Sequence, residues 1–480
     1  MTRRRLALCS LVVLVGLVAL AGCTLPESPD EFDTDREVGY VGDYAHDDEF
    51  AFDGDEPLTE AQLEDVKYRS MARIEVVRGL KFHHDVDLEV ITRSELRDQR
   101  SASEATAAEN ELWRGTFVVD GETDVATARD DLYGTAVQGY YVNDRIVVVT
   151  DDTEEIRIDR GTLVHELTHA LQDQQFGLAR YSATLDERRA EDGLIEGEAN
   201  YVPELYDDRC ETDWQCIPER ASTGSEPAPV DRPFNVGLFL SIYAPYSEGP
   251  AFVGHLHERE GWDAVDDAYD DRPASTSQII HPERYPDDGP VEVDLEDRSS
   301  DDWEPVTRDG EPHAETVGEA TLFATLWANG VVDRPLTEGG TERSPYNYSY
   351  PATDGWAGDA FQVYEDGDRT GHVWRLVWQS DEDADTFADA YRTLLENNEG
   401  ESVENESVYR IPDDEPFAGA YRIEVAGDTV EIVGAPTVDD LEAIGGEQTV
   451  TDGTATTIDP PQPATPAATD SATARAAADG

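Results

Sequence analysis

Residues 162–172, Thr-Leu-Val-His-Glu-Leu-Thr-His-Ala-Leu-Gln, constrain this chain more than any other stretch. Their apolar residues recur at helical spacing, which predicts a helix with one buried face. His165 and His169 lie four residues apart, so both imidazoles stand on one side of that helix. Two neutral imidazoles bind zinc well, and a carboxylate beside the first of them, here Glu166, can take a proton from a metal-bound water. The stretch therefore predicts two metal ligands and a general base.

A third ligand would distinguish a metal site from a packing helix whose two histidines only form hydrogen bonds. The best candidate is Glu196, which lies in a second helical pattern 27 residues after His169. Asp192 and Glu198 are its rivals, although Glu198 is offset from Glu196 by about 200° around a helix. Asn200 follows Glu196 by four residues and could hydrogen-bond the ring nitrogen of a ligand histidine that does not bind the metal.

Gly193 and Gly197 lie inside the same predicted helix, where each costs about 1 kcal/mol relative to alanine. Glycine is accepted at such positions when another element approaches the helix closely. We expect that element to be the helix that carries the two histidines.

These residues resemble those of known proteins. His165-Glu166-x-x-His169, followed by a glutamate on a second helix, is similar to the gluzincin branch of zinc metallopeptidases. The segments HELTHALQDQQF (residues 165–176) and LIEGEA (residues 194–199) are similar to poorly characterised haloarchaeal surface lipoproteins. The closer resemblance covers about residues 60–442.

The resemblance implies an α+β chain, in which a zincin-like metallopeptidase domain of mixed sheet and active-site helices precedes a smaller α+β module. It also implies Zn²⁺ held by His165, His169 and Glu196, and a peptide or protein substrate. The chain departs from thermolysin-like members in having Asn200 where they carry aspartate, and in the longer interval between the second histidine and the glutamate. The resemblance by itself does not establish peptidase activity.

The acidic composition restricts the function and the environment. The chain has 106 acidic and 36 basic residues, a formal net charge of -70, and only two lysines, Lys67 and Lys81. This argues against nucleic-acid binding, because phosphate contacts need Lys and Arg. Disorder is the other reading of such charge, but 39% hydrophobic residues and clear helix and strand patterns favour a folded protein. We interpret the chain as halophilic, since molar salt screens charges within about 3 Å.

The first 22 residues read as a lipoprotein signal peptide. Thr2-Arg3-Arg4-Arg5 is a positive start, residues 6–20 form an apolar run too short for a comfortable membrane span, and Leu-Ala-Gly-Cys23 resembles a lipobox. The arginine pair indicates twin-arginine export. We expect lipid on Cys23 and a mature chain anchored by it to the extracellular face of the cell membrane. A plain signal peptide or an anchor helix is the alternative.

One pair of cysteines remains outside the signal peptide and the lipobox, Cys210 and Cys216. Outside the cell such a pair predicts a disulfide that closes a small loop, whereas a metal site would need further ligands nearby. Asn347 and Asn405 each begin an Asn-x-Ser sequence and are candidates for N-glycosylation in an exported chain.

Composition and hydrophobic pattern divide the chain into six segments. They are a signal peptide (1–22), an acidic flexible tether (23–58), a zincin-like catalytic domain (59–285), a linker (286–312), a C-terminal α+β module (313–445) and a disordered tail (446–480). A β-hairpin over residues 137–150 precedes the histidine helix. By family resemblance, an edge strand at this place pairs with an extended peptide.

Tyr246 and His281 are candidates for a supporting role in catalysis. By family resemblance, gluzincins place a tyrosine or histidine opposite the metal, where it stabilises the oxyanion of the reaction. Helix packing is the simpler explanation for the aromatic and histidine residues around Tyr246.

The leading hypothesis is a lipid-anchored extracellular zinc peptidase. The alternative is a non-catalytic surface-binding or envelope lipoprotein that retains a zincin scaffold. The intact Glu166 favours the first, because a scaffold that only binds has no need of a base beside its first ligand. A purely structural zinc is a third possibility, but such sites close all four positions with protein ligands, and the sequence offers no convincing fourth.

Overall fold

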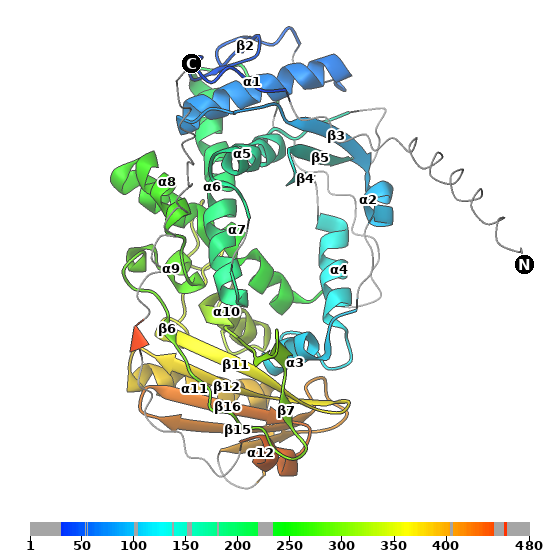
Figure 1. Ribbon diagram of the computed structural model, residues 1–480, viewed down its shortest axis with the longest axis vertical. Coiled ribbons are helices and arrows are strands. Elements are labelled where there is room, and N and C mark those ends of the chain that lie inside the picture. Colours follow the sequence, from blue (N-terminus) through cyan, green and yellow to red (C-terminus); the bar gives the residue numbers. More distant parts are fainter. Residues whose placement is uncertain are drawn as a thin grey trace, which may run out of the picture. The chain divides into compact units, whose positions relative to one another are not determined.

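The computed structural model describes residues 30–52, 54, 56–99, 104–136, 139–150, 156–179, 182–218, 234–403, 407–445 and 456–457 (Figure 1). The predicted signal peptide, Cys23 and nearly all of the predicted tail lie outside these residues. Within them, no helix is both long enough and apolar enough to cross a membrane. The fold is mixed α+β with several separate sheets, which confirms the predicted class.

The chain forms two compact units, each built from several segments. Unit 1 comprises Met1–Gln99, Val137–Leu178 and Val202–Thr223, and unit 2 comprises Arg100–Ala136, Ala179–Tyr201 and Gly224–Gly480. One helix, α6 (Leu185–Thr212), runs without interruption through the last residues of a unit 2 segment into unit 1. The spacing of its residues therefore follows from helix geometry alone.

Unit 1 holds a three-stranded sheet and the helices packed on it. Its elements are β1 (Tyr40–Val41), β2 (Tyr44–Ala45), α1 (Glu60–Arg78), β3 (Asp87–Thr92), α2 (Arg93–Gln99), β4 (Gly139–Val142), β5 (Arg145–Thr150) and α5 (Arg160–Phe176). The strand order is β3-β5-β4, with β3 parallel and β4 antiparallel to β5. Asn143 and Asp144 both have positive φ, as a tight two-residue hairpin turn requires, and this confirms the predicted hairpin.

The predicted flexible tether is wrong for its described part, from residue 30 onward. Val41 is fully buried, and Arg36 binds the Glu75 carboxylate of α1 at 2.6 Å. The Gly39 N–H donates to the same carboxylate at 3.0 Å. A fully buried carboxylate needs such partners. The acidic composition of the segment concealed these few specific contacts.

Arg73 of α1 connects three parts of unit 1. Its guanidinium is almost completely buried and donates to the carbonyl oxygens of His46 at 2.9 Å and Gln215 at 3.0 Å. Gln215 belongs to the small loop closed by a disulfide between Cys210 and Cys216, which confirms the predicted pairing. The N-terminal segment and the disulfide loop are thus both held on α1.

Unit 2 combines helices with one large antiparallel sheet. Its helices are α3 (Ala107–Gly115), α4 (Val125–Ala136), α7 (Val236–Glu260), α8 (Trp262–Asp270), α9 (Thr276–Ile280), η1 (Pro282–Arg284), α10 (Gly318–Ala328), α11 (Asp381–Asn397) and α12 (Val438–Gly445). Its strands are β6 (Val291–Glu292), β7 (Glu304–Pro305), β8 (Thr307–Arg308), β9 (Glu311–Pro312), β10 (Ala314–Glu315), β11 (Trp356–Asp366), β12 (Arg369–Trp378), β13 (Glu401–Ser402), β14 (Val408–Ile411), β15 (Gly419–Ala426), β16 (Thr429–Ala435) and β17 (Thr456–Thr457).

The large sheet has the order β10-β11-β12-β16-β15-β14-β13, with β7 also paired to β11 (Figure 1, yellow and orange strands). Alternate residues of its strands face opposite sides, as in any pleated sheet. Trp374 and Leu376 of β12 pack on one side, in a core that includes residues of α10 and α11. Val373 packs on the other side with Trp303 and with Leu441 of α12. Both faces are therefore covered.

The predicted linker at 286–312 does not separate two domains. Trp303 is almost fully buried under the sheet, and β7 pairs with β11. On the other face, Leu240 and Ala244 of α7 share one hydrophobic core with α10 and the sheet. The predicted boundary between 59–285 and 313–445 is therefore corrected, because α7 contributes its apolar face to the core of the C-terminal module.

Asp186, near the start of α6, is buried in unit 2 against the first turn of α10. The Thr276 backbone N–H and hydroxyl donate to Asp186 Oδ1 at 3.1 and 2.5 Å. Gly318 has a positive φ, and a Cβ built on it would overlap Asp186 Oδ1, so only glycine fits there. Burial, with the nearby carboxylates of Asp359 and Glu319, raises the pKa of Asp186 to about 8.

Asp186→Asn is expected to stabilise the protein most at alkaline pH. Because the pKa of Asp186 is raised from 3.8 to about 8, its contribution to stability is fully present below pH 3.8 and is lost as the pH rises to about 8. Asparagine keeps the acceptor for Thr276 and does not ionise. The gain in the free energy of unfolding should be about 3–5 kcal/mol larger at pH 9 than at pH 5, measured by denaturant unfolding in molar KCl. Asp301→Asn, which removes an exposed charge, is the control, and an equal gain at both pH values would contradict the prediction.

Candidate metal centre

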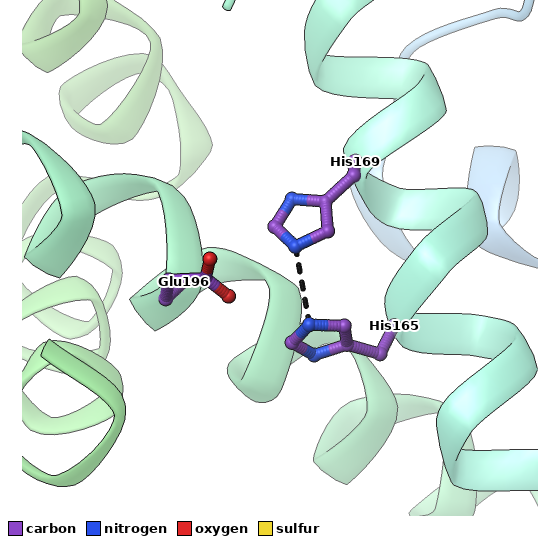
Figure 2. A group of neighbouring side chains, drawn as sticks. All are labelled: His165, His169 and Glu196. Carbon is purple, nitrogen blue, oxygen red and sulfur yellow. Dashed lines mark hydrogen bonds between the residues drawn. The ribbon is translucent and has the colours of Figure 1, made fainter. Parts of the chain in front are cut away.

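Two helices bring the three predicted ligands together. His165 and His169 stand on α5, and Glu196 stands on α6 (Figure 2). One ligand atom from each lies within 4.8 Å of the other two. The two imidazole Nε2 atoms are 3.1 Å apart. Ligands about 2.1 Å from one tetrahedral ion lie about 3.4 Å from each other, so the grouping is compatible with a shared ion.

The predicted helix α5 forms as its sequence indicates. The Asp159 side chain caps its start by accepting the Thr162 N–H at 2.8 Å, and Gly177 follows its end. Its apolar face is fully buried, through Leu163, Leu167, Ala170 and Leu171. This burial holds the opposite, histidine-bearing face in a defined orientation.

Gln172 orients one of the ligands. Its side-chain carbonyl lies 2.8 Å from Nδ1 of His169, and Gln172 is itself almost completely buried. A carbonyl can only accept a hydrogen bond, so Nδ1 carries the proton and Nε2 keeps its lone pair for a metal. Gln172 is not among the candidates predicted from the sequence, although its place three residues after His169 on the same helix could have indicated it.

The expected partner of the ligand histidines was Asn200, and that prediction is wrong. The Asn200 side-chain N–H donates to the backbone carbonyl of Glu196, one turn earlier in α6, at 2.8 Å. Asparagine forms such local bonds to its own helix readily. Gln172 occupies the role that Asn200 was predicted to have.

Glu166 lies beneath the hairpin that precedes α5. It is 6% exposed, and a Cβ built on Gly139 of β4 would stand 3.5 Å from its Cγ and 3.2 Å from Thr162 Cγ2. The Tyr141 hydroxyl of β4 donates to Asp173 of α5 at 2.8 Å, which fixes the strand on the helix. Strand β4 stands at the end of the order β3-β5-β4. The candidate base therefore lies directly beside an edge strand.

The rival third ligands are engaged elsewhere. Glu198 is buried and accepts a hydrogen bond from the Tyr269 hydroxyl at 2.5 Å. Asp192 lies 3.9 Å from Arg189, one turn earlier in α6. Neither belongs to the group formed by the two histidines and Glu196. This agrees with the helical offset that favoured Glu196 in the sequence.

The two glycines of α6 allow close packing, but against elements other than those predicted. A Cβ on Gly197 would lie 2.5 Å from the backbone carbonyl of Gly249 in α7, and one on Gly193 would lie 2.9 Å from Ile279 of α9. The expected neighbour was α5. The glycines therefore position Glu196 by seating α6 against α7 and α9.

Tyr246 and His281 have other contacts in unit 2. Tyr246 stacks on Tyr243 with ring centroids 5.9 Å apart, and His281 Nε2 lies 2.8 Å from Glu319 Oε1. These contacts give no support to an oxyanion-stabilising role. Both assignments stay predictions.

The glycosylation candidates differ in what the structure describes. Asn347 is partly buried, and its side chain accepts the Ser349 N–H at 3.1 Å. Asn405 lies outside the described residues. N-glycosylation stays a prediction at both.

The donor set suits zinc. Two imidazole nitrogens and one carboxylate oxygen are the ligands of many catalytic zinc sites, which leave a fourth position for water or substrate. The Nδ1–H of His169, fixed by Gln172, leaves the nitrogen that faces His165 able to coordinate. Among the described residues no thiolate is available as a ligand, because Cys210 and Cys216 form the disulfide.

Comparison with known proteins gives one match, to a part of the chain outside the metal centre. Residues 304–445 match a family model described as a domain of unknown function, DUF8575. This match covers most of the large sheet with α10, α11 and α12, and does not include α5 or α6. No curated protein matches the chain. No solved structure matches it either.

Gly197→Ala tests the seating of α6. Helix propensity alone predicts a gain of about 1 kcal/mol, whereas a methyl group 2.5 Å from the Gly249 backbone predicts a loss of about 1–3 kcal/mol. We expect the loss, together with weaker zinc binding as Glu196 shifts. Gly161→Ala on α5 is the control, because its Cβ would meet only Asp159 Oδ1 at 3.3 Å. Thermal unfolding and zinc titration measure both variants, and a stabilised Gly197→Ala protein would refute the packing argument.

Gln172→Ala tests the orientation of His169. Without the acceptor, the imidazole can rotate and place its proton on Nε2, so zinc affinity should fall about 10- to 100-fold. Gln175→Ala, which removes a bond to the Lys81 carbonyl from the same helix, should leave the affinity unchanged. Competition with a chromogenic chelator measures both, and equal affinities would remove Gln172 from the site.

Proposed function

We propose that this protein is a zinc-dependent peptidase, anchored by lipid on Cys23 at the extracellular face of the cell membrane. The observation that carries the proposal is the convergence of His165, His169 and Glu196 within 4.8 Å of one another, with the buried Glu166 next to the first ligand. A three-ligand nitrogen and oxygen set leaves room for water, whereas structural zinc sites usually do not.

Each residue has a distinct task in the proposed reaction. His165, His169 and Glu196 would hold the ion, and Gln172 would keep His169 in the coordinating tautomer. Bound zinc supplies a Lewis acid that activates water and polarises the scissile carbonyl. Glu166 accepts a proton from the attacking water and then delivers it to the leaving amine. Its burial beside β4 keeps the carboxylate in one place between the two proton transfers.

Strand β4 is the proposed docking edge for the substrate. The backbone of an edge strand has free hydrogen-bonding groups on its outer side, and an extended peptide can pair with them. Gly139 lies next to both Thr162 and Glu166, so a chain paired at this end of β4 would pass beside the candidate base. A side chain at Gly139 would stand tightly against Thr162 Cγ2 and the Val147 carbonyl oxygen, both 3.2 Å from an added Cβ, so glycine suits the close packing of β4 on α5.

Glu166→Gln and Glu196→Ala separate metal binding from chemistry. Glu166→Gln should retain about one zinc at the site and lose cleavage by at least 100-fold, because the amide cannot accept the proton. Glu196→Ala should lose the zinc ion of this site, and cleavage with it. Zinc is measured by elemental analysis of the tag-free protein in molar KCl, and cleavage by the release of amino groups from an unfolded protein substrate. Glu198→Gln, on the same helix but bound to Tyr269, is the control that should keep both.

The other outcomes are informative. Zinc bound by the wild type without any cleavage would favour the non-catalytic surface lipoprotein that retains the scaffold. Cleavage by Glu166→Gln at the wild-type rate would refute the assignment of the base. If the wild type binds no zinc, even after incubation with Zn²⁺, the metal site is refuted. In that case α5 is a packing helix whose two histidines only form hydrogen bonds.

A further inference from the structure

A second group of metal-ligating side chains lies within unit 2, and the proposed peptidase reaction does not use it. It consists of His281, Glu319 and Asp354, whose ligand atoms also lie within 4.8 Å of one another. His281 Nε2 is 2.8 Å from Glu319 Oε1 and 3.7 Å from Asp354 Oδ1. His281 directly follows α9, Glu319 belongs to the first turn of α10, and Asp354 lies in the turn before β11.

The protein neighbours of this group balance its charges only when His281 is protonated. Glu319 is fully buried, and Asp354 adds a second carboxylate. The nearest guanidinium, that of Arg284, is 3.4 Å from Glu319 Oε2, and its other nitrogen binds the backbone carbonyl of Asp354 at 2.6 Å. With a neutral imidazole, two carboxylates therefore face one cation. A buried excess of negative charge is costly unless a further positive charge joins it.

Asp359 of β11 is a further buried carboxylate, which lies against the start of α10 and has its own hydrogen-bond donors. Its two oxygens accept the backbone N–H groups of Val317 and Gly318 and the indole N–H groups of Trp356 and Trp374. These four donors are neutral and are used up by Asp359. A further positive charge beside Glu319 and Asp354 therefore comes either from a protonated His281 or from a bound cation.

We propose that His281, Glu319 and Asp354 form a second site for a divalent cation of the zinc or manganese class. A mixed imidazole and carboxylate set suits these ions, whereas calcium and magnesium prefer oxygen ligands throughout. The Glu319 side chain is fully buried and the His281 side chain is 13% exposed, whereas the Asp354 side chain is 36% exposed and would let the ion enter from solvent. The pair at 2.8 Å has to widen by only about half an ångström to share an ion.

The ion would join three segments of unit 2 that the sequence separates. One of them, α9, packs its Ile279 into the notch left by Gly193 of α6, one turn before Glu196. Thr276 of the same helix holds Asp186 near the start of α6. The second site thus has a structural role, in that it braces the helix that supplies the third ligand of the first site.

The competing explanation is an ion pair between protonated His281 and Glu319 with no metal. Metal counting distinguishes the two in the full-length chain, in a variant whose first site has been removed by His165→Ala and His169→Ala. After chelator treatment and titration with Zn²⁺ or Mn²⁺ in molar KCl, the wild type should take up two ions and the double variant one. The bound ion should also raise the melting temperature of the double variant.

Asp354→Asn in the double-variant background should weaken this remaining uptake at least tenfold, because the amide keeps the bond from Tyr350 N–H but loses the charge. Asp301→Asn is the charge-matched control and should change nothing. His281→Gln provides a second test if Asp354→Asn folds poorly. No uptake by the double variant, or uptake that neither substitution weakens, would overturn the second site. Loss of cleavage with one ion retained would concern only the first site, so the failures of the two proposals can be told apart.

Discussion

The backbone contact between α6 and α7 is the constraint on which the candidate metal centre depends. At Gly197 and Gly249 the two helices approach so closely that a single methyl group would overlap backbone atoms. Glu196 lies next to Gly197, so the seating of the helix fixes where the carboxylate stands. Two helical glycines lower the intrinsic stability of α6, and the packing they allow offsets that loss.

The short helix α9 extends the same arrangement. Ile279 fills the notch at Gly193, and Thr276 binds Asp186 near the start of α6. The end of α9 carries His281, which meets Glu319 of α10. One five-residue helix therefore connects the support of Glu196 to the second group of potential ligands. The sequence indicates no evident role for this segment, because Gly193, Asp186 and Glu319, which these three residues contact, are distant along the chain.

Buried carboxylates show how an extremely acidic chain builds an interior. Salt screens the surface charge, but it does not reach groups such as Glu111 and Glu248. Burial acts to raise the pKa of Glu111, yet Arg114 and His372 more than offset this and lower it to about 2. Glu248 has only hydroxyl donors from Ser344 and Ser247 beside it, and burial raises its pKa to about 7. The partner, rather than the burial, decides which acid keeps its charge.

Local patterns in the sequence determined much of this protein. The cap and apolar stripe of α5, the hairpin of β4 and β5, the disulfide and the candidate ligands His165, His169 and Glu196 all follow from short-range rules. Helical periodicity also favoured Glu196 over its rival Glu198, because angular position on one helix is a local property. What the tertiary structure alone decided is which distant elements meet. It replaced Asn200 by Gln172 as the partner of His169, directed Gly193 and Gly197 towards α9 and α7, and merged the predicted linker into the core around Trp303. Each of these outcomes depends on side-chain packing between segments far apart in the chain, which periodicity and composition do not encode.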